Sequence, residues 1–141
     1  MPDKKTSAAN QFIQSLPHSV ALGMELVEIG DGFAVIRMPY DKRLIGDPET
    51  GVIHGGAVSA LMDTCGGAAV MSHPSGANGT ATLDLRIDYM RPATPGQTIT
   101  ARAECYNATR SVAFVRATAT DDDHERPVAA ATGAFTLERS K

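Results

Sequence analysis

The sequence predicts an α+β fold in which a curved antiparallel sheet of five to six strands wraps around one long central helix. Three observations lead to this prediction. The stretch at 51–72 is small and apolar over almost five helical turns after His54. The segments between residues 80 and 137 have the composition of strands, and the first of them alternates clearly between apolar and polar residues. Short turn signals separate these segments, so we expect neighbouring strands to run antiparallel.

The first part of the chain carries weaker signals of the same kind. Phe12, Ile13 and Leu16 have helical spacing and Pro17 follows them, so a short helix is expected at 8–16 after a frayed polar start at 1–7. Strands are expected on both sides of a Gly-Asp-Gly turn, at 21–29 and 32–40, and a loop at 41–50. The later strands are expected at 80–89, 97–107, 112–120 and 127–137, the last with a bulge at Gly133.

Length and composition indicate one globular domain. The chain has 141 residues, of which 43% are hydrophobic and 21% charged. We expect residues 1–20 to form an N-terminal tail and short helix, and residues 21–141 to form a single domain. The net charge of -3 argues against a general nucleic-acid-binding protein. A single helix-and-sheet layer leaves the other face and the edges of the sheet uncovered, which favours an oligomer.

Neither a metal nor a cofactor is expected. Cys65 and Cys105 are too few for a disulfide framework or a cysteine-based zinc site, and the four histidines lack ligand spacing. Cys65 falls on the apolar side of the central helix, which favours a core residue over a nucleophile. The N-terminus has no apolar signal-peptide core. A charged Asp63 at the centre of a membrane span would cost about 2.5–3.5 kcal/mol, so we expect no membrane span and a cytoplasmic protein.

Asp63 is the one ionisable side chain in the middle of the central helix. Small residues share its side of the helix and apolar residues fill the other, so the helix is expected to be covered all round. A covered carboxylate needs partners, because burying an unpaired charge is costly. Asp63 could instead project into water, or be satisfied by Ser59 or backbone amides. The helix start favours a third reading, catalysis.

The sequence His54-Gly55-Gly56 lies about two turns before Asp63. Glycine amides that open a helix have unpaired N–H groups, and such an end stabilises developing negative charge. Because glycine has no side chain, a ligand can approach this backbone closely. A carboxylate and an oxyanion site on one element are the parts that acyl transfer requires.

These residues resemble the hotdog-fold thioesterases, specifically the phenylacetic-acid-degradation type within the 4-hydroxybenzoyl-CoA thioesterase superfamily. The likeness rests on the pattern Gly51-x-x-His54-Gly55-Gly56 with Asp63 seven residues later, and on the segment 82–93 with its Tyr-Met-Arg-Pro-Ala run. The turn Thr109-Arg110-Ser111 before a strand adds a third feature. Together they span about residues 22–137.

The resemblance implies hydrolysis of an acyl-CoA thioester without a cofactor. It assigns Asp63 as the carboxylate that attacks the thioester or activates water, and the Gly55 amide as the group that polarises the carbonyl. It also implies that His54 orients the site and that Thr82 positions the carboxylate. Gly56, Arg91, Arg110 and Ser111 are expected to contact the substrate or CoA, with Arg91 and Arg110 as exposed phosphate ligands. The alternative for His54 is a helix-entry residue, and the alternative for both Arg91 and Arg110 is a solvated turn charge.

The family further implies a homodimer, or a homotetramer built as a dimer of dimers, with each active site at a subunit interface. The geometry of the central helix supports a shared site. Gly55 and Asp63 lie eight residues apart on it, which is about 12 Å and too far for one reacting carbon atom to meet both groups. One departure concerns the segment Asp47-Pro48-Glu49-Thr50, where several relatives carry Asn or Gln, so Glu49, Thr50 or a water must substitute. Two other functions stay open, namely a hotdog dehydratase or hydratase and a non-catalytic acyl-CoA-binding module. The identity of the acyl group is not predicted.

Overall fold

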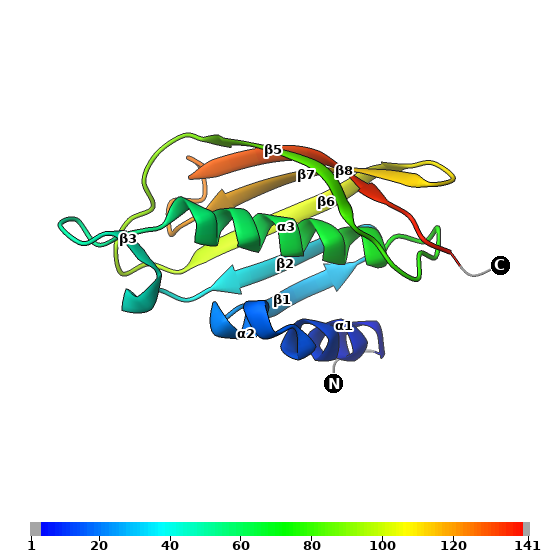
Figure 1. Ribbon diagram of the computed structural model, residues 1–141, viewed down its shortest axis with the longest axis horizontal. Helices are drawn as coiled ribbons and strands as arrows, with labels where there is room; N and C mark the ends of the chain where they lie inside the picture. The colour runs from blue at the N-terminus through cyan, green and yellow to red at the C-terminus, as the bar shows by residue number, and fades with distance from the viewer. Residues whose placement is uncertain (1–3, 140–141) are drawn as a thin grey trace.

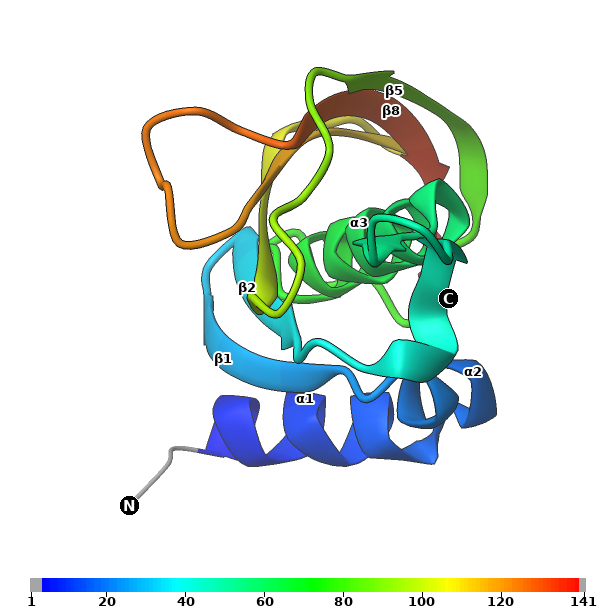
Figure 2. The same ribbon diagram turned by 90° about the vertical axis from the view of Figure 1, so that its left-hand side faces the viewer.

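The protein folds as one long helix held against a six-stranded antiparallel sheet (Figure 1). The structure, a computed structural model, describes residues 4–139. The helix is α3 (Gly55–Met71). The sheet has the order β1-β2-β6-β7-β8-β5. Its strands, in that order, are β1 (Glu25–Gly30), β2 (Phe33–Met38), β6 (Ile99–Ala108), β7 (Val112–Thr120), β8 (Ala129–Thr136) and β5 (Thr82–Tyr89). Viewed along the helix, the sheet curves around α3 (Figure 2), so the predicted fold class is confirmed.

The N-terminal helical region is longer than the sequence predicts and contains two helices. Helix α1 (Lys4–Ser15) begins four residues before the predicted start, and the side chain of Ile13 is buried. A second helix, α2 (Pro17–Ala21), begins at the proline that ends α1, because proline is favoured in the first turn of a helix. This second helix moves the start of β1 to Glu25. Residues 1–3 of the predicted frayed start lie outside the described residues.

The predicted loop at 41–50 contains structure of its own. A short 3-10 helix, η1 (Lys42–Leu44), is capped by the Asp41 carboxylate and precedes β3 (Ile45–Asp47). β3 pairs with β4 (Val52–Ile53) as a small hairpin that leads into α3. Such short pairings carry too few alternating residues for a sequence pattern to indicate them.

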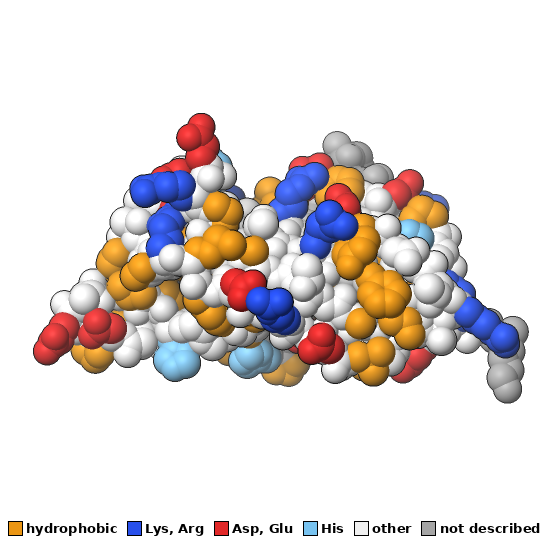
Figure 3. All heavy atoms as spheres, turned by 90° about the horizontal axis from the view of Figure 1, so that it is seen from above, with side chains coloured by type: hydrophobic (Ala, Val, Ile, Leu, Met, Phe, Trp, Pro, Cys, Tyr) orange, Lys and Arg blue, Asp and Glu red, His pale blue; other side chains and the backbone are white. Residues whose placement is uncertain are grey.

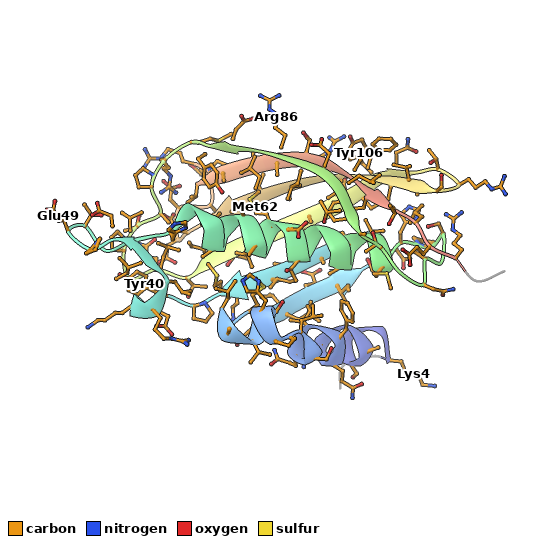
Figure 4. All side chains as sticks on the ribbon, viewed as in Figure 1. Lys4, Tyr40, Glu49, Met62, Arg86 and Tyr106 are labelled. Carbon is orange, nitrogen blue, oxygen red and sulfur yellow. The ribbon has the colours of Figure 1, made fainter. Side chains whose placement is uncertain are left out.

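α3 is buried on the side that faces the sheet and partly open on the other. Met62, at the centre of the helix, points into the core with Leu61 and Cys65 (Figure 4). Gly66 and Val70, which the sequence places on the opposite side, are buried too. The residues on the open side are small or polar and include Ser59, Ala60, Asp63, Thr64 and Gly67. The expectation that the helix is covered all round is therefore wrong for the single chain.

A bulge near the start of β5 changes which residues face α3. The pairing with β8 shifts between Thr82, opposite Phe135, and Asp84, opposite Ala134. Strict alternation would place Thr82 with Asp84 and Arg86. The extra residue at Leu83 turns Thr82 toward the helix instead. The prediction of a bulge at Gly133 is wrong, because Gly133 pairs in register with Leu85. A glycine is needed there because the Asp84 carbonyl comes too close to leave room for a side chain.

The two edges of the sheet differ. α1 packs against β1 at one edge. At the other edge β5, eight residues long, has no partner strand on its outer side among residues 4–139. No helix of the described residues has the length and apolarity that a membrane crossing requires.

Candidate active site

Asp63 and Thr82 are in direct contact. Thr82 Oγ1 donates a hydrogen bond of 2.5 Å to Asp63 Oδ1, which joins the middle of α3 to the first residue of β5. Asp63 is partly exposed, and no hydrogen bond to its Oδ2 is found among the described residues. The contact fixes one carboxylate oxygen and leaves the other available at the open side of the helix.

The start of α3 presents a free amide beside a capped one. His54 is the N-cap, and its Nδ1 accepts a hydrogen bond of 2.8 Å from the Gly56 N–H. The Ala57 N–H donates to the His54 carbonyl. Among the described residues the Gly55 N–H has no acceptor, so it is the first-turn amide that remains free for an oxygen atom of a ligand. The geometry of His54 is that of a helix-entry residue. Because the Gly56 amide is already engaged, substrate contact by that amide would require displacement of His54.

Tyr89 and Ser59 hold this helix start in place, and neither was predicted as a site residue. The Tyr89 hydroxyl donates to the Gly55 carbonyl at 2.8 Å, and Ser59 Oγ lies 3.2 Å from the same oxygen. The two hydroxyl groups also hydrogen-bond to each other. The sequence signal that could have identified Tyr89 is the alternation of β5, which places Tyr89 on the same face of the strand as Leu85 and Ile87. The peptide group after Gly55 is thereby fixed at both ends.

One chain does not bring the carboxylate and the free amide together. Gly55 and Asp63 lie on the same straight helix, eight residues apart, and a helix rises by 1.5 Å per residue. About 12 Å therefore separates them along the axis, which is too far for one reacting carbon atom to meet both groups.

The exposed position predicted for Arg91 is wrong. Its side chain is 21% exposed and binds both carboxylate oxygens of the buried Asp121, each at 2.7 Å. Its remaining N–H groups donate to the carbonyls of Pro92 and Arg126. All five guanidinium donors are thus used within the chain. The Arg91 guanidinium holds the pKa of Asp121 well below its usual range. We read this pair as a clamp between the end of β5 and the 121–126 turn, with no donor left for a phosphate.

The other predicted substrate contacts lie away from Asp63. Arg110 and Ser111 are exposed in the turn between β6 and β7, where the Arg110 carbonyl accepts from Arg139 and the Ser111 carbonyl accepts from the Leu137 N–H. Glu49 lies at the tip of the β3–β4 hairpin and points away from the body of the chain (Figure 4). Thr50 Oγ1 donates to Asp47 within that same tip. Neither side chain reaches Asp63 of its own chain.

Both free cysteines are buried. Burial raises the pKa of the Cys65 thiol to about 12, and the thiol donates to the Ala34 carbonyl in the core. Cys65 is therefore a core residue, as predicted. Residues 4–139 contain no group of three His, Cys, Asp or Glu side chains arranged to hold a metal ion. A dehydratase would pair a histidine with a carboxylate, and among the described residues His54 hydrogen-bonds to the Gly56 N–H and to no carboxylate.

Comparison with known proteins decides the family. The profile of the thioesterase superfamily matches residues 50–128, the segment that carries His54, Gly55, Asp63 and Thr82. The chain belongs to the thioesterase superfamily. The match covers more than half of the chain and contains both α3 and β5.

Individual relatives of this thioesterase-superfamily chain agree with that result. A putative esterase of Halobacterium salinarum is 42% identical over 76 residues, which is 51% of this chain and half the length of that protein. The acyl-coenzyme A thioesterase PaaI of Escherichia coli is 32% identical over 104 residues, covering 74% of this chain and 71% of PaaI. A crystal structure of a Pseudomonas aeruginosa protein superposes with a TM-score of 0.83 at 39% identity, covering 94% of this chain and 98% of that one.

Proposed function

We propose that this chain is an acyl-CoA thioesterase, which hydrolyses the thioester of an acyl-CoA to the free acid and CoA. The observation that supports this most is the Asp63 carboxylate, whose Oδ1 is held by Thr82 while Oδ2 stays available. The similarity to the thioesterase PaaI supports the choice of an acyl-CoA as the substrate.

The chemistry follows from the two groups. Asp63 either attacks the thioester carbon or takes a proton from a water that attacks it. Either path places negative charge on the thioester oxygen, and the free Gly55 N–H at the start of α3 stabilises that charge. Cleavage of the carbon–sulfur bond then releases CoA as the thiol, and one water is consumed overall.

The active site in this proposal is shared between two subunits of a homodimer, or of a dimer of dimers. Asp63 comes from one subunit and Gly55 from the other, which removes the separation of about 12 Å within one chain. The unpaired edge of β5 supports this assembly, since exposed strand edges pair readily. Leu83, Tyr89 and Met90, on and after β5, are each more than half exposed. Seen from the β5 side, hydrophobic side chains lie on the surface among charged ones (Figure 3).

Arg110 and Ser111 are proposed to contact the nucleotide end of CoA, and His54 to orient the site. Replacing Arg110 by Ala should raise KM several-fold at low salt and leave kcat nearly unchanged, because exposed ion pairs contribute only about 0.2–1 kcal/mol. A pantetheine thioester without the nucleotide is the control. Equal losses on both substrates would refute the contact. A cytoplasmic location remains a prediction from the sequence.

Release of free thiol tests the activity directly. Acetyl-, hexanoyl- and phenylacetyl-CoA are incubated with the protein, and the thiol is followed with a colorimetric reagent. We expect release with at least one substrate, and a loss of about 10²-fold or more in the Asp63→Asn variant. A folded protein that releases no thiol from any of them, or an Asp63→Asn variant at the wild-type rate, would contradict the proposal.

A further inference from the structure

Two neighbouring hollows lie beside the C-terminal half of α3. The first, of about 240 Å³, lies between α1 and α3. The second, of about 160 Å³, contains Asp63 and Thr82 in its wall. Phe12, Ala68 and Met71 line both hollows. The two hollows therefore adjoin at these residues, and we call them together the α1 groove, which begins at the candidate catalytic carboxylate.

The character of the wall changes along the α1 groove. The Asp63 end is lined by Thr64, Thr80 and Thr82. The far end is lined by alanines, Ile13 and Ile29, with Ser72 as its one polar side chain. Ser72 is buried, and its hydroxyl donates to the Ala69 carbonyl at 2.9 Å. A ligand with a polar group at Asp63 and an apolar tail would match both ends.

α1 itself is divided in the same way. Ala8, Ala9, Phe12 and Ile13 face the groove, while Thr6, Ser7, Asn10 and Gln11 line a separate surface on the other side of the helix. Phe12, at the junction of the two hollows, is 50% exposed. A large apolar side chain left open beside a catalytic group is what an apolar ligand would cover.

We propose that the α1 groove binds the acyl chain of the substrate, so that the enzyme acts on linear acyl groups of medium to long length. This inference rests on the proposed thioesterase function. The thioester lies at Asp63, and the chain extends past Phe12 and Met71 toward Ile29. Each methylene that enters the groove should raise kcat/KM by up to about fourfold, because it leaves water for an apolar wall.

A matched pair of variants on α1 tests the proposal. Ala9→Trp fills the groove, and Asn10→Trp adds the same bulk on the opposite side of α1. Wild-type protein should prefer dodecanoyl- over hexanoyl- over acetyl-CoA. Ala9→Trp should lower kcat/KM for dodecanoyl-CoA by about tenfold or more and leave acetyl-CoA nearly unchanged, while Asn10→Trp keeps the wild-type profile. An unchanged profile in Ala9→Trp would overturn the groove assignment without touching the thioesterase function.

A binding measurement separates the groove from catalysis. The chain has no tryptophan, so Phe12→Trp introduces a single fluorescent reporter at the junction of the two hollows. A brominated twelve-carbon fatty acid, which resembles the reaction product, should quench this tryptophan saturably and quench the one in Asn10→Trp much less. Equal quenching of the two variants would refute binding in the groove. Saturable quenching in a protein that releases no thiol would support the groove and contradict the proposed function.

Discussion

At the scale of single residues, the proposed chemistry depends most on the hydrogen bond from Thr82 to Asp63. It fixes Oδ1 and so decides where Oδ2 points. Thr82→Val removes the hydroxyl and keeps the shape of the side chain. Because a hydrogen bond to a charged group contributes about 1.5–3 kcal/mol, we expect kcat to fall roughly tenfold to a hundredfold.

Thr82→Ser is the matched control, since it restores the donor, and kcat should return close to the wild-type value. Steady-state kinetics of both variants, with thermal unfolding to check the fold, measure the effect. A valine variant with wild-type kcat would show that Thr82 is a passive neighbour of the carboxylate.

The Arg91–Asp121 pair makes a prediction about stability. Asp121 accepts four hydrogen bonds, two from Arg91 and one each from the Thr94 and Asp123 amides. Its pKa is lowered in the folded state, so its stabilisation is present above the unfolded value of about 3.9 and is lost as pH falls below it. Asp121→Asn should lower the free energy of unfolding by about 2 kcal/mol at pH 7, because buried donors lose their charged acceptor.

Urea unfolding at pH 7 and at pH 3 measures this, and the gap between wild type and Asp121→Asn should narrow at the lower pH. Asp88→Asn, which removes an exposed ion pair with Arg86, is the control and should change little at either pH. A gap that stays constant or widens on acidification would be inconsistent with the clamp.

At the scale of elements, two neighbouring glycines of α3 differ in the space available for an added side chain. A methyl group added at Gly66 would lie 2.8 Å from Cζ of Phe135, whereas at Gly67 the nearest atom is Cγ2 of Thr80 at 3.8 Å. Both Gly→Ala changes gain the same helix propensity, so the difference between them isolates the clash. We expect Gly66→Ala to be less stable than Gly67→Ala by about 1–3 kcal/mol.

Chemical denaturation of the two variants gives this difference directly. Equal stabilities would mean that the sheet moves away from the helix at no cost, contrary to the close packing of the core. Gly67→Ala should be at least as stable as the wild type.

The sequence predicts those elements whose signals are local. The start of α3 at His54-Gly55-Gly56 and the strand at 112–120 follow from neighbouring residues alone, and both are found where expected. The face of Thr82 was not predictable from alternation, because the bulge depends on how β5 pairs with β8. Arg91 was placed on the surface because its partner, Asp121, lies 30 residues away in the sequence. Tyr89 was missed as a site residue for the same reason, since it contacts Gly55 across the fold.

At the scale of the whole molecule, the single chain carries both proposed catalytic groups but keeps them apart. The carboxylate lies in the middle of α3, the free amide lies at its start, and the open side of α3 and the bare edge of β5 adjoin them. Antiparallel pairing of two such chains about a twofold axis would bring the start of one α3 toward the middle of the other. We propose that this assembly completes the active site.

Mixing two inactive chains tests that claim most directly. Asp63→Asn removes the carboxylate and Gly55→Pro removes the amide. Proline is accepted in the first turn of a helix, and the preceding His54 already has the extended backbone that proline requires. The two variants are co-expressed with different affinity tags, and assemblies that carry both tags are purified. If each site takes Asp63 from one subunit and Gly55 from the other, a mixed dimer regains one of its two sites and about half of the wild-type thioesterase activity. Doubly tagged assemblies that stay as inactive as either variant alone would contradict the shared site.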